Sequence, residues 1–274
     1  MTVLKAACIQ VNSGPEIAGN LDMVEPLIHV AAGRGAQFIA LPENVAVMIK
    51  GRDKVIARAR PEAEHPGIPF FKRMAKETGT WIVGGTLAIR LGSDKLANRC
   101  YLFSPQGEVA ATYDKIHMFD ANIGEGETYR ESETFQSGTR AVVADTALGK
   151  IGLTVCYDMR FAYLYRALAK AGAAIITVPS AFTVPTGRMH WQVLLRARAI
   201  ETGAFVIAPA QCGTHESGRQ TYGHSLIVDP MGQVLAEAGD IPEIIMADLD
   251  LAKVGEAHRM LPSLQHDRDF SVTC

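Results

Sequence analysis

The sequence predicts an α/β fold in which two β-sheets pack face to face and helices cover their outer faces. Strand-like apolar runs alternate with helix-like segments at first and then pair with each other, so strand pairs are as common as β-α-β units. No linker, low-complexity tract or internal repeat interrupts the 274 residues. We therefore expect residues 1–274 to form a single domain with a large core.

The expected strands are short apolar runs bounded by turn residues. Pro42 stops the second run from extending, because proline cannot donate to a strand ladder. The segment Ser104-Pro105-Gln106-Gly107 is a turn that joins two runs as a hairpin, and Leu148-Gly149-Lys150 joins another pair. The last three runs are expected to form a closing meander. The expected strands span residues 3–11, 36–41, 81–89, 100–103, 109–113, 141–146, 151–155, 173–179, 204–209, 223–228, 234–237 and 244–249.

The expected helices repeat their apolar residues with the 3.6-residue period of a helix. In the first, Ile17, Leu21 and Val24 share a face, but Pro26 follows, and a proline inside a helix costs about 3 kcal/mol. We expect a kink or a late start there. Gly79 closes the second helix. The expected helices span residues 17–32, 66–78, 161–171, 188–202 and 251–259.

The composition favours small polar substrates over macromolecular partners. The chain has 27 basic and 29 acidic residues and no long run of either sign, so nothing indicates a nucleic-acid or anionic-membrane partner. The N-terminus lacks a secretory pattern, and no apolar stretch approaches the roughly 20 residues that span a bilayer. A soluble protein without membrane association is expected.

The cysteines indicate free thiols in a reducing cytoplasm. Five of them, an odd number, stand at wide and irregular spacing. No C-x-x-C pair, H-E-x-x-H motif or histidine cluster offers the spacing of metal ligands. We expect no metal and no other cofactor.

Three reactive side chains, Glu43, Lys115 and Cys156, stand where a strand-like run gives way to a loop. Strand ends lie side by side in a sheet, so the three can meet in one pocket. Amide cleavage needs a nucleophile, a proton donor for the leaving nitrogen and charge to stabilise the oxyanion. Cys156, before an expected helix N-terminus that favours thiolate, supplies the first. Glu43, with a pKa raised by desolvation, is the general base, and Lys115 is the fixed cation.

Each of the three also has an ordinary structural interpretation. A cysteine that ends a buried strand is usually inert core, a carboxylate there is solvated or caps the next segment, and a loop lysine is a common surface residue. His117, two residues from Lys115, suggests a papain-like Cys/His pair, but that pair would leave Glu43 and Lys115 without a purpose. Only the sequence contexts distinguish these possibilities.

Those contexts resemble the nitrilase, or carbon-nitrogen hydrolase, superfamily. They are Leu41-Pro42-Glu43, Asp114-Lys115-Ile116-His117 and Cys156-Tyr157-Asp158-Met159-Arg160-Phe161, and the resemblance continues through residues 181–187, 190–191 and 196–202. It covers nearly the whole chain. It implies a four-layer αββα sandwich with two mixed sheets, a Glu-Lys-Cys mechanism that passes through a thioester, and a homodimer or larger homo-oligomer joined through helices and the C-terminal region. The backbone N–H of Tyr157 would join Lys115 at the oxyanion.

The family often has a second glutamate after the lysine, which helps to hold the substrate and the lysine. Glu131 matches that position by motif. The same polar stretch, residues 115–138, also contains Glu125, Glu127 and Glu133, and it is too long for an ordinary connection. We expect it to be a functional loop.

Within the superfamily, residues 208–215 and 222–225 resemble the Nit subgroup and its Nit1-like members. The resemblance implies an amidase for deaminated glutathione that releases cysteinylglycine. An ω-amidase that releases ammonia from 2-oxoglutaramate is the alternative. Arg160, Arg188 and Thr183 are candidates to bind a substrate carboxylate, although a structural role suits Arg160 better, and Phe182 and Thr183 should line the pocket wall. A binding or scaffold protein without turnover is the alternative of a different class.

Overall fold

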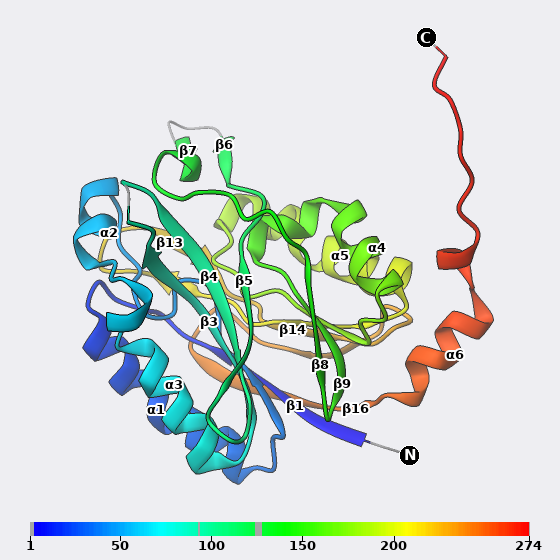
Figure 1. Ribbon diagram of the computed structural model, residues 1–274, viewed down its shortest axis with the longest axis horizontal. Helices are drawn as coiled ribbons and strands as arrows, with labels where there is room; N and C mark the ends of the chain where they lie inside the picture. The colour runs from blue at the N-terminus through cyan, green and yellow to red at the C-terminus, as the bar shows by residue number, and fades with distance from the viewer. Residues whose placement is uncertain (1–2, 93, 124–127, 274) are drawn as a thin grey trace.

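The computed structural model describes residues 3–92, 94–123 and 128–273, and two six-stranded sheets form its centre (Figure 1). The first sheet consists, in spatial order, of β16 (Glu243–Asp250), β1 (Val3–Gln10), β2 (Phe38–Ala40), β3 (Trp81–Arg90), β4 (Leu96–Phe103) and β5 (Val109–Asp114). The second consists of β15 (Val234–Glu237), β14 (Leu226–Val228), β11 (Phe205–Ala208), β10 (Ile175–Thr177), β9 (Gly149–Leu153) and β8 (Val142–Thr146). In each sheet a parallel centre is extended by antiparallel strands.

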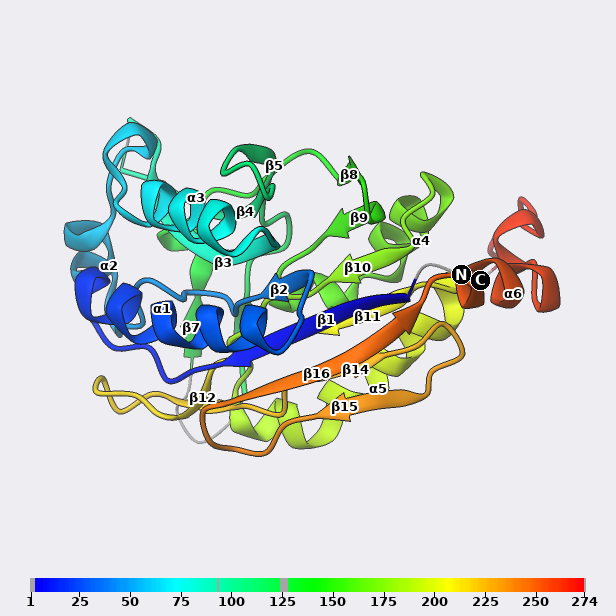
Figure 2. The ribbon, with the colours of Figure 1, turned by 90° about the horizontal axis from the view of Figure 1, so that it is seen from below.

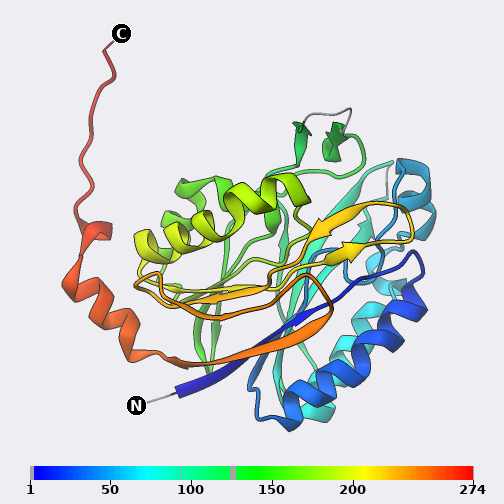
Figure 3. The same cartoon turned by 180° about the vertical axis from the view of Figure 1, so that it is seen from behind.

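Helices cover the outer face of each sheet. Figures 2 and 3 show α1 and α3 on the first sheet and α4 and α5 on the second, so the expected four-layer α/β sandwich is confirmed. The helices are α1 (Ile17–Gly33), α2 (Arg52–Arg58), α3 (Gly67–Thr78), α4 (Ala162–Lys170), α5 (Val184–Thr202) and α6 (Ala252–Met260). Short 3₁₀ helices are η1 (Glu62–Glu64), η2 (Glu131–Glu133), η3 (Cys156–Arg160) and η4 (Ser263–Gln265).

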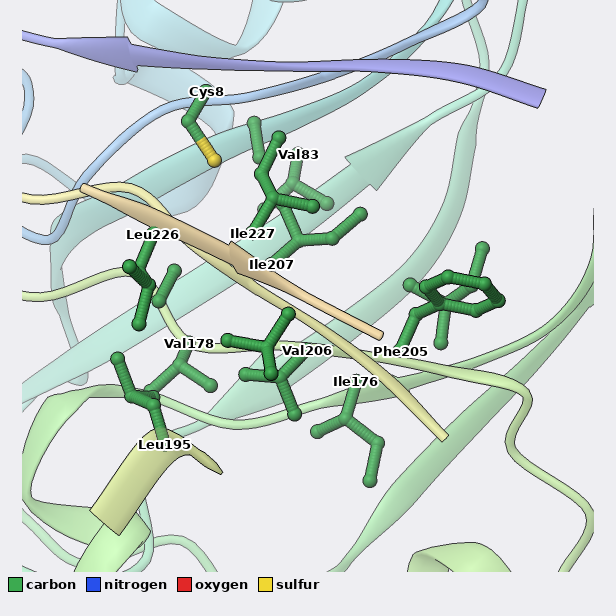
Figure 4. Close-up of a cluster of buried hydrophobic side chains, with 14 of the residues drawn as sticks. Cys8, Val83, Ile176, Val178, Leu195, Phe205, Val206, Ile207, Leu226 and Ile227 are labelled. Carbon is green, nitrogen blue, oxygen red and sulfur yellow. The ribbon is translucent and has the colours of Figure 1, made fainter. Parts of the chain in front are cut away.

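Period-two alternation in the strands produces these layers. In β1, Cys8 faces the core between the sheets, whereas Ile9 packs with α1 and α3 on the outer side. Figure 4 shows Cys8 beside Ile207 and Ile227 of the second sheet, with Leu195 of α5 on that sheet's opposite face. Central strands such as β2 and β11 are therefore buried on both faces, whereas the edge strands β5, β8 and β15 also carry exposed residues.

Several expected elements differ from the structure. The closing meander was wrong: β16 leaves β15 and pairs antiparallel with the whole of β1, because an eight-residue strand covers that edge fully. Helix α1 starts at Ile17 with Pro26 inside it, so there is no late start. Helix α5 starts at Val184, four residues early, since Pro185 falls in its first turn, where a missing N–H costs little.

Two short strand pairs and one helix were not anticipated. The pairs are β6 (Asp120–Asn122) with β7 (Thr128–Arg130) and β12 (Cys212–Thr214) with β13 (Gln220–Tyr222), and the helix is α2. Both pairs lie on the side of the sandwich away from α6 (Figures 2 and 3). Across the described ranges, no helix is both long and apolar enough to span a bilayer.

Candidate active site

Lys115 lies at the centre of a buried group of charged side chains. Its ammonium nitrogen is 2.9 Å from Oε1 of Glu43 and 2.7 Å from Oε2 of Glu131, and its side chain is only 2% exposed. Burial alone would lower the pKa of Lys115, but the charges of Glu131 and Glu43 outweigh burial and raise that pKa above its ordinary value. The lysine is therefore a fixed cation held between two carboxylates.

Glu43 lies three residues after the end of β2, and hydrogen bonds fix its side chain. Its Oε2 accepts the backbone N–H of Ala181 at 3.0 Å, and its Oε1 accepts the side-chain amide of Asn98 at 2.9 Å. Burial would raise the pKa of Glu43, as we expected, but the charge and hydrogen bond of Lys115 outweigh burial and hold the pKa below its usual value. The expected rise is therefore wrong, and Glu43 is an anion in the free enzyme.

The neighbouring strand β3 contacts the chain immediately before and after Glu43. Its register with β4 shifts between Val83 and Thr86, and Gly85 at this irregularity has φ of 59°. A Cβ atom on Gly85 would lie 2.0 Å from the carbonyl oxygen of Pro42, so only glycine permits this approach. Thr86 then accepts the backbone N–H of Asn44 at 2.8 Å through its hydroxyl. The bulge thus fixes the chain on both sides of Glu43.

Cys156 follows β9 and begins η3 in a left-handed conformation, with φ of 48°. Its backbone N–H donates to the carbonyl of Pro179 at 2.9 Å, and its thiol lies near enough to Glu43 for each group to shift the pKa of the other. Burial and the charge of Glu43 raise the pKa of the thiol, and Lys115 offsets this only in part. The expected thiolate is wrong because burial and the charge of Glu43 outweigh the charge of Lys115. The helix that was expected to favour a thiolate, α4, starts only at Ala162.

Asp158, which is completely buried, ties the Lys115 segment to the Cys156 turn. Its carboxylate accepts the hydroxyl of Tyr113 at 2.7 Å and the backbone N–H groups of Val155 at 2.9 Å and His117 at 3.0 Å. The His117 ring contacts the same carboxylate and stacks on Phe161. His117 therefore orients these two segments and does not face Cys156 as in a papain-like pair.

Glu131, at the start of η2, is the described glutamate of the 115–138 stretch that pairs with Lys115. Its Oε2 also accepts the backbone N–H of Phe119 at 2.6 Å. Glu133 has no hydrogen bond with Lys115, and Glu125 and Glu127 lie outside the described residues. The functional stretch 115–138 thus contributes at least Lys115 and Glu131 to one cluster.

Asn98 was missed in the sequence, although it is buried beside the charged cluster. Its side-chain amide donates to Oε1 of Glu43 and, at 3.1 Å, to Oε1 of Glu131. One signal was visible: asparagine is disfavoured inside strands, yet Asn98 stands in the middle of the apolar strand β4. A buried asparagine inside a strand indicates a polar partner, and here its partners are Glu43 and Glu131.

Glu43, Lys115, Glu131 and Cys156 line a cavity of about 610 Å³. Tyr157, Phe182 and Thr183 also line it. Tyr157 is the second residue of η3, a position where a backbone N–H lacks a partner within the helix. Arg160 and Arg188 do not line the cavity. The Arg160 guanidinium lies over the rings of Tyr157 and Phe182, and Arg188 is exposed on α5. The structure therefore gives neither arginine a place in the lining of this cavity.

A buried carboxylate, ammonium and thiol in one cavity are what amide cleavage requires. They follow β2, the edge strand β5 and β9, respectively. Residues 5–259 match the family model described as carbon-nitrogen hydrolase. The chain belongs to the carbon-nitrogen hydrolase family. Within the described residues, no group of three or more His, Cys, Asp or Glu side chains is arranged to hold a metal ion.

Relatives of this carbon-nitrogen hydrolase span its whole length. A protein named deaminated glutathione amidase from Synechocystis is 39% identical, with 95% of this chain and 97% of that protein covered. The human protein of that name is 41% identical, covering 97% of this chain and 82% of its own. The crystal structure of the C. elegans NitFhit protein has a TM-score of 0.90 at 33% identity; it covers 97% of this chain, which spans 65% of that protein.

One further structure concerns the chemistry of the family. A mutant amidase from Nesterenkonia, 26% identical with a TM-score of 0.80 and 94% of this chain covered, carries the product of acrylamide addition at its active-site cysteine. This chain spans 98% of that amidase. Together with the family match, this likeness supports cysteine-dependent amidase chemistry for the carbon-nitrogen hydrolase.

The Nit1-like segment of this hydrolase fixes the wall beside Glu43. Gln211, fully buried, donates to the carbonyl of Glu43 at 3.1 Å and to the hydroxyl of Ser13 at 2.8 Å. Tyr222 packs against Gly187 of α5 so closely that a Cβ there would lie 2.2 Å from its ring. The motif residues at 187, 211 and 222 are therefore structural.

Proposed function

We propose that this carbon-nitrogen hydrolase cleaves deaminated glutathione into 2-oxoglutarate and cysteinylglycine, with Cys156 as the nucleophile. The observation that carries the proposal is Lys115, held 2.9 Å from Glu43 and 2.7 Å from Glu131 in the cavity that exposes Cys156. The choice of substrate is supported by the relatives named deaminated glutathione amidase, which are 39% and 41% identical to this chain.

The charge and size of the cavity support a dianionic substrate. Five cationic side chains line it against three carboxylates, and deaminated glutathione carries one carboxylate at each end. A volume of 610 Å³ falls within the range of roughly 300–1,000 Å³ typical of small-molecule sites. It leaves room for a dipeptide leaving group beyond the oxo-acid half.

In the first half-reaction, Glu43 takes the proton of Cys156 as the sulfur attacks the amide carbon. Lys115 and the backbone N–H of Tyr157 stabilise the oxyanion. Glu43 then passes its proton to the amide nitrogen, the C–N bond breaks, and cysteinylglycine leaves a thioester on Cys156.

In the second half-reaction, Glu43 removes a proton from water, which attacks the thioester. The C–S bond breaks, 2-oxoglutarate leaves, and the sulfur regains a proton. Glu131 and Asn98 stay bonded throughout, so that the cation and the base keep their places. Phe182 and Thr183 form the apolar wall against the acyl chain.

The proposal is tested by comparing kcat/KM for deaminated glutathione, 2-oxoglutaramate and a simple nitrile. A preference of at least about tenfold for deaminated glutathione is expected, because only that substrate fills the leaving-group side. A preference for 2-oxoglutaramate would indicate an ω-amidase, and a preference for the nitrile would overturn the amidase assignment. A chain without turnover on any of them would support a binding role.

We also propose that the enzyme is a cytoplasmic homodimer formed by one domain that spans residues 1–274. Met189, Val193 and Ile200 form an exposed apolar stripe along α5, each at least 50% exposed. Figures 1 and 3 show the C-terminal segment leaving the sandwich, with Phe270 87% exposed. A second copy that covers the stripe would agree with the dimers that the family resemblance implies. Four free cysteines in the described ranges agree with a reducing compartment.

A further inference from the structure

Arg219 is a cation of the cavity that forms no ion pair with a carboxylate of the described residues. It immediately precedes β13, between the two parts of the Nit1-like motif (residues 208–215 and 222–225), and lines the cavity together with Cys156. Its guanidinium has five N–H bonds on three nitrogen atoms. One of these nitrogens, Nη2, donates to the carbonyl of Ala181 at 2.9 Å.

The remaining donors of Arg219 have no protein acceptor in the described chain. Its Nε is buried without a hydrogen-bond partner, and leaving such a group unsatisfied costs about 1–3 kcal/mol. The guanidinium is nevertheless held in place, because it also lies over the ring of Tyr129, 5.6 Å from the ring centre. A fixed guanidinium with open donors matches the requirements of a carboxylate.

The other arginines of the cavity are already engaged by the protein. Arg130 donates to the side chain of Asn122 and to a backbone carbonyl, and Arg52 lies near Asp53 and donates to the carbonyl of Glu133. Lys115 is neutralised by its two glutamates. Arg219 is therefore the arginine of the cavity best placed to accept an anion.

Arg219 also lies on the side of the cavity where the base is held. Ala181, whose carbonyl it binds, donates its own N–H to Glu43 at 3.0 Å, and the charge of Arg219 contributes to holding the pKa of Glu43 low. A substrate carboxylate bound at Arg219 would therefore set the distance between its amide bond and Glu43.

We propose that Arg219 is a specificity-determining residue that binds a carboxylate of the substrate through its guanidinium. The inference rests on the proposed function, since deaminated glutathione offers a carboxylate on the 2-oxo acid and another on the terminal glycine. The two carboxylates can form the same hydrogen bonds with an arginine. The ester series below distinguishes them.

The test compares wild type, Arg219→Gln and Arg219→Lys on deaminated glutathione, its two monomethyl esters and its dimethyl ester. Arg219→Gln should raise KM for deaminated glutathione about 10- to 100-fold with a smaller change in kcat, and Arg219→Lys should recover part of the loss. The dimethyl ester, which has no charge, should be handled alike by wild type and Arg219→Gln. The monoester on which the two enzymes become equal identifies the carboxylate that Arg219 binds.

Two results would overturn the assignment. One is an unchanged KM for deaminated glutathione in Arg219→Gln, and the other is an equal loss of kcat on the dimethyl ester, which would indicate that Arg219 acts only through Ala181. Arg34→Gln, at an exposed site at the end of α1, controls for the lost charge.

A binding measurement tests the role of Arg219 independently of the proposed function. Calorimetric titration of deaminated glutathione into Cys156→Ala and Cys156→Ala/Arg219→Gln needs no turnover. Weaker binding by the double variant supports the role of Arg219 even if the wild-type enzyme prefers another amide. Equal binding by the two variants contradicts it.

Discussion

Asn98 donates one hydrogen bond to Glu43 at 2.9 Å from a position 2% exposed to solvent, and the same nitrogen reaches Glu131. The two glutamates therefore share two donors, Asn98 and Lys115. A neutral donor keeps the carboxylates in register without changing the net charge of the cluster. This relationship leads to the first prediction.

Replacing Asn98 by Leu should lower kcat about 10- to 100-fold with a smaller change in KM, because the base moves away from the reacting atoms. Since a donated hydrogen bond stabilises the carboxylate form, its loss should raise the pKa of Glu43, and the acidic limb of the kcat/KM profile should move to higher pH. The pH profile checks this. Asn122→Ala, in the exposed part of β6, is the control, and an unmoved acidic limb in Asn98→Leu would contradict the role.

Replacing Cys156 by Ala should abolish turnover while the melting temperature changes by only a few degrees, because the side chain is small and its neighbours stay bonded. Cys8→Ala is the matched control: Cys8 is a buried thiol of the inter-sheet core, so activity should persist. Initial rates and circular dichroism check both variants. Substantial hydrolysis by Cys156→Ala would refute the assignment of the nucleophile.

The pKa directions at Glu43 and Cys156 predict the pH dependence. The pKa of Glu43 lies below its ordinary 4.5, so the base is lost only as pH falls below about 4.5, and kcat/KM should be level from about pH 5 to 8. The pKa of Cys156 lies above its ordinary 9.0, so alkylation by iodoacetamide in the free enzyme should accelerate only above about pH 9. An alkylation midpoint near pH 6 would show a resting thiolate instead.

Glu43→Gln should separate the two roles of that carboxylate. Hydrolysis should fall by at least about 100-fold, because the base is gone. Alkylation of Cys156 at pH 8 should become faster, because the Glu43 charge that raises the thiol pKa is removed while Lys115 remains. Mass spectrometry of the labelled peptide measures the rate. Slower labelling would mean that Glu43 activates the thiol even without substrate.

The layers of the fold and the central cluster could be predicted from the sequence because both depend on patterns of residues that are close together in the chain. Continuous apolar runs specify strands that are buried on both faces, and the contexts of Glu43, Lys115 and Cys156 are continuous motifs. Asn98 is an unusual residue for a strand, but its partner Glu43 could not be predicted in this way, since only the pairing of β4 with its neighbours brings the two together. The partner of β16 was missed for the same reason: strand order is a long-range property.

Protonation states were the other failure, and the reason is electrostatic. Burial considered one residue at a time predicts a raised pKa for Glu43 and, with a helix end, a thiolate at Cys156. The distances that decide the outcome, such as 2.9 Å from Lys115 to Glu43, join residues 72 positions apart. Likewise, the sequence motifs indicate Arg160, Arg188 and Thr183 as candidate carboxylate ligands, whereas Arg219 lines the cavity from a hairpin that the sequence did not reveal.

Gly187→Ala should destabilise the enzyme, because its Cβ would lie 2.2 Å from the Tyr222 ring. Overpacking of this kind costs about 1–3 kcal/mol and should lower the melting temperature by roughly 2–10 °C. Gly19→Ala, inside α1 with no atom within 4 Å of the new Cβ, is the matched control and should be neutral or slightly stabilising. Thermal unfolding of both variants checks this, and an equal melting temperature would contradict the predicted clash.

Val193→Glu should convert the proposed dimer into a monomer. Val193 is 66% exposed at the centre of the α5 stripe, and a dimer would place its charge in an apolar interface, at a cost of several kcal/mol. Sedimentation velocity checks the mass, and Arg140→Glu, at an exposed site away from the stripe, is the control. Because Val193 does not line the cavity, a monomer that keeps wild-type kcat would show that each subunit carries a complete site. A wild-type chain that sediments as a monomer, or a Val193→Glu variant that stays dimeric, would refute this interface.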